Sequence, residues 1–123
     1  MALLRILALS LLGCLPLTAV ADTILLMAEE EGCVWCERWD REISAIYPKT
    51  DEGRAAPLLR HDIRAELPQG IALAGKLQFT PTFVLLRDGQ EIGRIEGYPG
   101  EAFFWGLLGQ MLAKTRTQSE ETG

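Results

Sequence analysis

The distribution of apolar positions along the chain predicts four strands. Unbroken apolar runs at 23–28 and 83–86 are typical of central strands whose two faces are both buried. A more polar run at 58–63 predicts another strand, and residues 91–96 predict a strand that returns after the Asp88-Gly89 turn signal. The last two strands are therefore expected to form an antiparallel hairpin.

Apolar residues at helical spacing predict three helices, over 33–47, 68–77 and 101–114. Pro48 ends the first helix, because the residue before a proline avoids helical geometry, and 49–57 is expected to be a loop. The expected buried stripe of the first helix is Cys36, Trp39, Ile43 and Ile46, and that of the last is Phe104, Leu107, Leu108 and Met111.

The predicted order of elements is strand, helix, strand, helix, strand, strand and helix. A strand–helix–strand unit needs a right-handed crossover and a covered sheet, and the hairpin adds antiparallel strands. We therefore expect the α/β class, with a three-layer α/β/α sandwich around a central four-stranded mixed sheet. A chain of 123 residues has the size of one such domain, which we place at 22–114, followed by a flexible polar tail at 115–123.

The first 21 residues predict an export signal. A short positive region ending at Arg5 precedes an apolar core, and Ala19-Val20-Ala21 matches an A-x-A cleavage site. The alternative is a lipoprotein signal ending at Cys14, which would leave the protein lipid-anchored through that residue. The formal net charge of −5 argues against a general nucleic-acid role, which usually needs a basic face.

Removal of the signal leaves Cys33 and Cys36 as the only cysteines, in a C-x-x-C pair. Such a pair is half of a zinc site, a structural disulfide or a redox dithiol. A zinc site needs two more ligands, for which the sole His61 and scattered carboxylates are poor material. A disulfide across so small a loop adds little stability. The redox interpretation is favoured, because the pair follows a buried strand and begins a helix.

The position of the pair predicts different roles for its two sulfurs. At a helix N-terminus, unpaired N–H groups and the helix dipole lower the pKa of a thiol. Cys33 is therefore expected to be the exposed attacking sulfur. Cys36, at the start of the buried stripe, is expected to be shielded and to resolve a mixed disulfide. The three glutamates at 29–31 act against this by repelling a thiolate, and the balance depends on distances.

A second motif, Thr80-Pro81-Thr82, precedes the apolar run at 83–86. A proline at such a place is often no more than a turn. In a fold with this element order, a cis Thr80–Pro81 bond would instead place a backbone edge beside the dithiol. The free N–H and C=O of Thr80 could then pair with a substrate strand.

Together, the C-x-x-C pair, the T-P-T motif, the Asp-Gly hairpin and the glycine that follows it resemble the thioredoxin superfamily over residues 23–113. More narrowly, the sequence around the cysteines (EEEGCVWCERWDREI), with FTPTFVL and EIGRIEGYPG, resembles the exported thioredoxins encoded with bacterial sulfur-oxidation (Sox) genes. The resemblance implies a periplasmic thiol–disulfide reductase that has no cofactor beyond its own redox-active disulfide and no metal.

What the resemblance implies about the site is carried over by position. Cys33 would be the nucleophile, Cys36 the resolving cysteine, Pro81 the cis-proline, and Thr80 with Gly97 part of the substrate groove. The implied partners are proteins: the sulfur-carrier protein SoxYZ, whose reactive cysteine would be kept reduced, and a membrane electron donor of the thiol relay. The alternatives are a periplasmic dithiol oxidant and a non-enzymatic regulatory or binding protein.

The chain departs from thioredoxin at two places. Thioredoxin has a buried aspartate six positions before its first cysteine, where this chain has Met27, so another group or water must accept the proton. The Trp-Cys-Gly-Pro-Cys motif is replaced by Gly-Cys-Val-Trp-Cys, so the redox potential does not follow from the resemblance. Related dithiols span about −270 to −120 mV, which includes both reductants and oxidants.

Five other polar or aromatic residues also have an expected environment. Trp35, between the cysteines, is expected to be exposed and either to contact a partner or to pack at the helix start. Trp39 is expected in the core and His61 on the surface of its strand. Arg38 and Glu42 stand at the i,i+4 spacing of an exposed helical ion pair.

Overall fold

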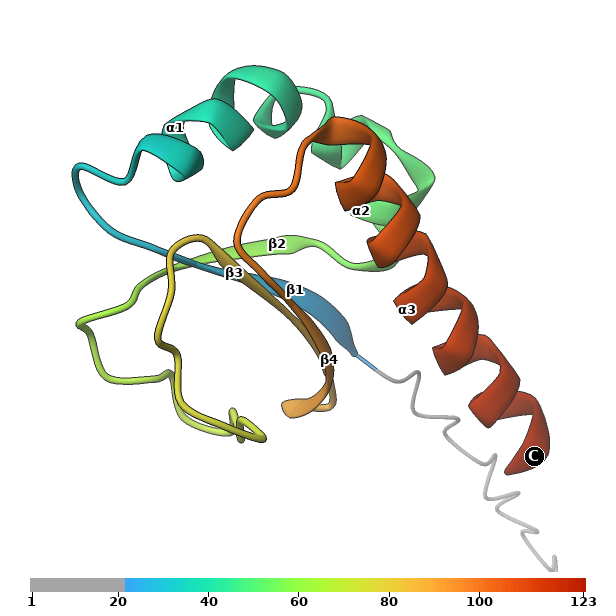
Figure 1. The fold of residues 1–123 in the computed structure, drawn as a ribbon. Helices are drawn as coiled ribbons and strands as arrows, with labels where there is room; N and C mark the ends of the chain where they lie inside the picture. Colours follow the sequence, from blue (N-terminus) through green and yellow to red (C-terminus); the bar gives the residue numbers. More distant parts are fainter. Residues whose placement is uncertain (1–21) are drawn as a thin grey trace, which may run out of the picture.

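The computed structural model describes residues 22–123 (Figure 1). The expected export signal at 1–21, with the alternative lipidation site Cys14, lies outside the described residues. Among residues 22–123, none of the helices combines the length and the apolar character that a membrane span requires.

A four-stranded sheet in the order β2-β1-β3-β4 forms the centre of the molecule. β2 runs parallel to β1, whereas β3 is antiparallel to both β1 and β4. The predicted mixed sheet is therefore confirmed. The strands are β1 (Thr23–Glu29), β2 (Leu58–Asp62), β3 (Thr82–Arg87) and β4 (Gln90–Glu96).

The β3–β4 hairpin turns at Asp88 and Gly89, as predicted, with φ values of 49° and 79°. Positive φ at both turn residues matches the twist of the strands they join. The register shifts between Leu85 and Leu86, which pair with Gly93 and Glu91 respectively, so Ile92 is the extra residue of a β-bulge. The bulge explains the imperfect alternation of apolar residues along β4.

The first helical region is interrupted by one π-helical turn. α1 (Val34–Trp39) continues into π-helical η1 (Asp40–Ser44), which is followed by the 3₁₀ turn η2 (Tyr47–Lys49). A π turn takes up an extra residue, so the inward position after Ile43 is Tyr47, which is 1% exposed. The prediction of Ile46 in the buried stripe is wrong, because this residue is 44% exposed.

The segment expected to be a loop at 49–57 contains the short helix α2 (Asp51–Ala55). Thr50 caps the helix: its Oγ1 accepts the N–H of Gly53 at 3.0 Å and donates to the carbonyl of Tyr47 at 2.6 Å. The Tyr47 hydroxyl in turn donates to the carbonyl of Ala56 at 2.6 Å. α2 is thus attached at both ends to the residue that ends the first buried stripe.

The predicted helix at 68–77 is wrong. Gly70 has a φ of +85°, which a helix does not allow, and a second glycine at 75 lowers helix propensity further. The chain instead runs irregularly along β4, and Ala72 forms an isolated parallel bridge with Gln90. The segment 63–81, which follows β2, nevertheless forms the third layer of the sandwich, because it covers the face of the sheet opposite the helices (Figure 1).

The last helix, α3 (Glu101–Glu121), continues seven residues beyond its predicted end at 114, into the expected tail. Residues 116–123 are exposed. The buried stripe follows the i, i+4, i+8 row of Phe104, Leu108 and Leu112. Leu107, predicted to be buried, is 38% exposed because it lies beside this row.

The core on the helix face of the sheet is aromatic. The rings of Trp39 and Phe83 lie 5.3 Å apart, and the Phe104 ring lies 4.9 Å from Phe83 and 5.8 Å from Trp39. All three side chains are fully buried, which confirms the prediction for Trp39. The opposite face buries smaller residues, namely Leu26, Ala28, Val84 and Leu86, against Leu59, Ile71, Leu73 and Leu77.

Candidate dithiol active site

Cys33 and Cys36 form a disulfide at the start of α1. Gly32, with a φ of +79°, turns the chain from β1 into the helix, and the N–H of Cys33 closes that turn on the carbonyl of Glu30 at 3.3 Å. Cys33 occupies the N-cap position, and its Sγ accepts the backbone N–H of Cys36 at 3.1 Å. The sulfur therefore takes the place of the oxygen acceptor of an ordinary cap.

The expected contrast in exposure between the two cysteines is small in this disulfide form. Cys33 is 9% exposed and Cys36 is 5% exposed, and both belong to the helix-face core. The prediction of an exposed Cys33 is therefore wrong here, because its sulfur is directed toward the helix amide and bonded to Cys36.

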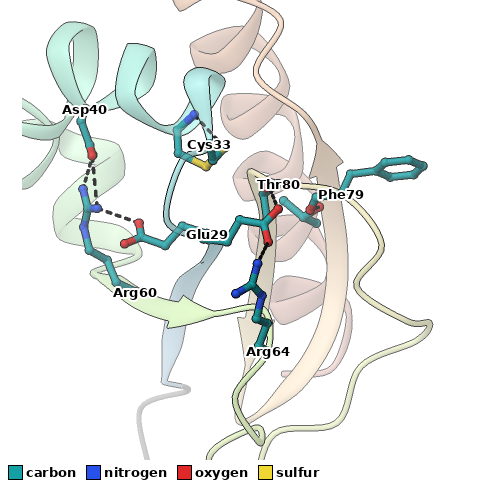
Figure 2. The surroundings of a disulfide bond; sticks show 10 residues. Glu29, Cys33, Asp40, Arg60, Arg64, Phe79 and Thr80 are labelled. Atoms are coloured by element: carbon teal, nitrogen blue, oxygen red, sulfur yellow. Dashed lines mark hydrogen bonds and ion pairs between the residues drawn. A yellow bond between two sulfur atoms is a disulfide. The ribbon is translucent and has the colours of Figure 1, made fainter.

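The Thr80 loop lies next to the turn that carries Cys33 (Figure 2). The Thr80–Pro81 peptide bond is cis, Pro81 is buried, and the Thr80 hydroxyl donates to Glu30 Oε1 at 3.1 Å. The carbonyl of Pro81 accepts the N–H of Gly97 at 2.7 Å. The structure thus brings Thr80, Pro81 and Gly97 together from two separate parts of the chain.

The backbone of Thr80 is unpaired. Within residues 22–123, neither its N–H nor its C=O makes a hydrogen bond. A backbone donor and acceptor left open at a chain segment beside a disulfide can pair with an added strand.

Two of the three glutamates near the dithiol form ion pairs with arginines, Arg60 and Arg64, both of which are labelled in Figure 2. Glu29 accepts from Arg60 Nη1 at 2.7 Å, and Glu30 lies 3.4 Å from Arg64 Nη2. Only Glu31 of the three stands without such a pair among the described residues. The repulsion that these carboxylates exert on a thiolate is accordingly weaker than the sequence suggests, although exposed pairs of this kind are individually weak.

Arg60 is a site neighbour that the sequence reading missed. It ion-pairs with Asp40 of the π turn, donates to Ser44 Oγ at 3.2 Å, and its guanidinium carbon lies 5.7 Å from the Trp39 ring centroid. In the sequence Arg60 only dilutes an apolar strand. The available signal was its position two residues after Leu58. Residues at i and i+2 of a strand point to the same face of a sheet, here the helix face.

Met27 and His61 lie on opposite faces of the sheet. Met27 is fully buried in the helix-face core, so it supplies no carboxylate where thioredoxin has one. His61 pairs with Ala28 in the β1–β2 register and is 7% exposed, so the prediction of a surface residue is wrong. It is covered because the irregular segment closes its face of the sheet. His61 is therefore on the face of the sheet opposite the dithiol, and its buried Nε2 has no hydrogen-bond partner within residues 22–123.

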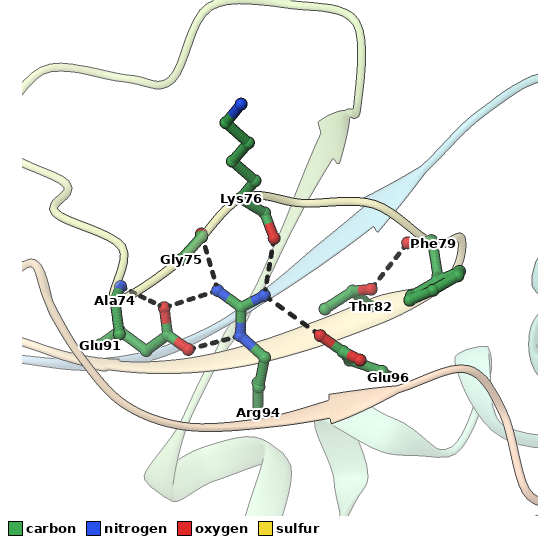
Figure 3. A network of polar contacts seen from close by, with 8 residues as sticks. All are labelled: Ala74, Gly75, Lys76, Phe79, Thr82, Glu91, Arg94 and Glu96. Atoms are coloured by element: carbon green, nitrogen blue, oxygen red, sulfur yellow. Dashed lines mark hydrogen bonds and ion pairs between the residues drawn. The ribbon is translucent and has the colours of Figure 1, made fainter.

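A polar clip fixes the segment that ends in the Thr80 loop (Figure 3). Arg94 on β4 forms an ion pair with Glu91 through Nε at 2.5 Å, and donates to the carbonyls of Gly75 and Lys76 at 3.0 Å each. The other carboxylate oxygen of Glu91 accepts the backbone N–H of Ala74 at 2.7 Å. The side chains of Arg94 and Glu91 are only 17% and 6% exposed.

A helix that begins at a C-x-x-C disulfide, beside a cis-proline loop on a mixed sheet, defines a thioredoxin-like thiol–disulfide oxidoreductase. The chain is 52% identical to the periplasmic thioredoxin SoxS from Paracoccus pantotrophus, whose crystal structure in the reduced form it matches with a TM-score of 0.75. The match covers 76% of this chain and 99% of that one. No protein-family model and no curated protein matches the chain. The chain belongs to the SoxS family of thioredoxins.

Proposed function

We propose that this protein is a periplasmic disulfide reductase in which Cys33 is the nucleophile and Cys36 the resolving cysteine. The export signal expected at 1–21 and the periplasmic location of the SoxS relative support the compartment. The observation that carries the assignment of the sulfurs is the N–H of Cys36, which points at Cys33 Sγ from 3.1 Å. In the reduced protein this donor would stabilise a Cys33 thiolate.

The reaction proceeds in two exchanges. The Cys33 thiolate attacks one sulfur of the partner's disulfide, so that a mixed disulfide forms and the partner's other cysteine leaves as a thiolate. Cys36 then loses its proton to water and attacks Cys33 Sγ. The Cys33–Cys36 bond forms, the partner's remaining cysteine leaves as a thiolate, and two electrons have passed to the partner.

The substrate groove consists of Thr80, Pro81 and Gly97, with Trp35 at its rim. The unpaired N–H and C=O of Thr80 support this role, because an extended substrate segment can add to them as a strand. Trp35 supports it because the side chain is 52% exposed on the turn between the two cysteines.

The partners that the SoxS relationship suggests are proteins of the sulfur-oxidation system. We infer that the substrate is the sulfur-carrier protein SoxYZ, whose cysteine the reductase keeps usable, and that a membrane thiol relay returns the electrons. No metal or further cofactor takes part in this scheme.

A trapping experiment tests the proposal. In Cys36→Ser the second exchange is removed, so a mixed disulfide through Cys33 accumulates and is isolated from periplasmic extract as one dominant adduct. The matched control is Cys33→Ser, which removes the nucleophile and leaves no adduct. The assignment fails if the Cys36→Ser protein forms no adduct after it has been reduced again. It also fails if the Cys33→Ser protein forms the same adduct.

The direction of electron flow has its own test. The reductase role predicts a reduction potential of about −270 mV, at the thioredoxin end of the known range. Equilibration with glutathione buffers measures it. A value near about −120 mV, with the oxidised form dominant in cells, would make the protein a dithiol oxidant instead.

A further inference from the structure

Trp35 does not pack into the core, although it lies in the first turn of α1. It is 52% exposed, and the contact that orients it comes from Arg38, whose guanidinium carbon lies 5.6 Å from the ring centroid. A guanidinium over an indole face is a favourable cation–π arrangement. The ring thus has a cation over it and still remains half exposed.

Arg38 is itself fixed by two residues, and we call Arg38, Glu42 and Tyr98 the Arg38 clamp. Arg38 Nε donates to Glu42 Oε1 at 2.8 Å, and its guanidinium carbon lies 5.9 Å from the centroid of the Tyr98 ring. The Tyr98 hydroxyl donates to the other oxygen of the same carboxylate, Oε2. The Glu42 carboxylate thus binds both the Arg38 guanidinium and the Tyr98 hydroxyl.

The clamp keeps its charges at neutral pH. Hydrogen bonds from Arg38 and Tyr98 hold the pKa of the Glu42 carboxyl below its usual range. Burial, together with the hydrogen bond to Glu42, raises the pKa of the Tyr98 hydroxyl, which therefore remains a donor. Glu42 therefore stays ionised and Tyr98 stays protonated at the pH values at which a thiolate reacts with a disulfide.

The clamp also connects the parts of the proposed groove. Tyr98, 6% exposed, follows Gly97, whose N–H donates to the carbonyl of Pro81 at 2.7 Å. Glu42 and Arg38 belong to the helical region that begins at the dithiol. Tyr98 thus contacts the arginine that lies over Trp35 and directly follows the residue that bonds Pro81.

We propose that Arg38, Glu42 and Tyr98 are positioning residues that fix the Trp35 ring as a preformed contact for protein substrates. The proposal rests on the reductase function above. Its partner is an extended, cysteine-bearing segment with an apolar side chain near the cysteine, because Val34 and Phe79 are also exposed at this site, by 68% and 54%. A ring that is already ordered loses less conformational entropy on binding. A small disulfide lacks such a segment, so we expect the clamp to contribute nothing to its reduction.

Arg38→Met tests the clamp, because methionine keeps the length and apolar volume of the side chain without its charge. Arg41→Met, an exposed arginine three positions further along the same helical region, is the matched control. Reduction of insulin disulfides serves as the protein assay and reduction of hydroxyethyl disulfide as the small-molecule assay, both with dithiothreitol as electron source. We expect Arg38→Met to raise KM for insulin about threefold to fivefold with kcat unchanged, and to leave hydroxyethyl disulfide reduction as in wild type.

Fluorescence supplies a readout that loss of stability alone would not change. Of the three tryptophans, Trp35 is 52% exposed, Trp105 is partly buried and Trp39 is fully buried, so the part of the acrylamide quenching that is lost in Trp35→Leu reports the Trp35 ring. Quenching increases in Arg38→Met and in Tyr98→Phe, which retains the aromatic ring and removes only the hydroxyl. In a Trp35→Leu background, Arg38→Met causes no further rise in KM, since the residue it positions is gone.

Unchanged insulin KM and unchanged quenching in both Arg38→Met and Tyr98→Phe would overturn the proposal, as would additive effects of Arg38→Met and Trp35→Leu. An equal loss with both disulfides would also overturn it, because the clamp would then act on the chemistry. Failure of the reductase function shows earlier and separately: the wild-type protein would reduce neither disulfide faster than dithiothreitol alone does.

Discussion

The two faces of the sheet bury comparable positions but are stabilised by different means. On the helix face, aromatic rings from α1, β3 and α3 pack against one another within 5.8 Å. On the other face, aliphatic side chains are covered by a segment without regular structure, which the Arg94–Glu91 clip ties to β4. The helix face is stabilised by the fit of its buried side chains, whereas the opposite face is stabilised by a few polar contacts to backbone atoms.

This difference between the two faces indicates which side of the fold is the more rigid. The dithiol begins a helix that is packed into the aromatic core, so the reacting sulfurs sit on the rigid side. The Thr80 loop ends the irregular segment on the other side, where hydrogen bonds and an ion pair set its position. Chemistry and recognition are thus supported by different kinds of interaction.

The largest effect is expected from two neighbouring leucines that face opposite sides. Leu85, 0% exposed, belongs to the helix face, and Leu86, 1% exposed, to the other face. Truncation to alanine costs about 2–5 kcal/mol, more where the surroundings cannot collapse. In urea unfolding, we expect the loss of unfolding free energy to be near the upper end of this range for Leu85→Ala and near the lower end for Leu86→Ala. Equal losses, or a larger loss for Leu86→Ala, would show that the irregular layer is as rigid as the helices.

A smaller effect is expected from Arg94→Met, which removes the clip and leaves the Glu91 carboxylate poorly paired. The expected loss is about 1–3 kcal/mol, with faster amide exchange at Ala74, whose N–H bonds Glu91. The control is Arg54→Met, since Arg54 and Asp51 form an exposed pair with side chains 61% and 95% exposed. Protection at Ala74 that survives Arg94→Met would show that apolar contacts alone hold the segment.

The same clip predicts a dependence on pH. The hydrogen bond from Arg94 holds the pKa of Glu91 below its ordinary value of 4.5. The stability that Glu91 contributes is therefore fully present above pH 4.5 and is lost as the pH falls through the lowered folded-state value. The difference in unfolding free energy between wild type and Arg94→Met should shrink over that acid range and stay constant above it.

The smallest effect is expected at His61, a buried residue whose Nε2 has no hydrogen-bond partner among residues 22–123. Replacement of an unsatisfied buried polar group by an apolar one is nearly neutral or stabilising. His61→Leu should change the free energy of unfolding by less than about 1 kcal/mol, in the stabilising direction. A loss larger than this in urea unfolding would mean that the imidazole makes a bond that leucine cannot replace.

The strands were predictable because a strand buried on both faces is an unbroken apolar run. The helix at 68–77 was mispredicted because apolar spacing does not distinguish a helix from an irregular segment that buries the same Ile71, Leu73 and Leu77. Ile46 was predicted to be buried in place of Tyr47, because the sequence carries no clear sign of the π turn.

The site was predictable only as far as its motifs. The C-x-x-C pair and Thr80-Pro81 are local signals, and so is the i,i+4 spacing of Arg38 and Glu42, whose ion pair is confirmed at 2.8 Å. The charges that decide the electrostatics come from distant positions. Arg60 lies 31 residues from Glu29, and Tyr98 lies 56 from Glu42, and such pairs become visible only when the fold is known.

The Arg94–Glu91 clip binds the irregular segment through main-chain atoms: two carbonyl oxygens and one amide. It therefore places no demand on the side chains of Ala74, Gly75 and Lys76, and a Cβ added at Gly75 would meet no atom within 4 Å. This stretch is a suitable site for grafting: new sequences can be inserted into a fixed backbone path that leads to the Thr80 loop. A library in this stretch would vary the side chains that precede the Thr80 loop without altering the sulfurs themselves.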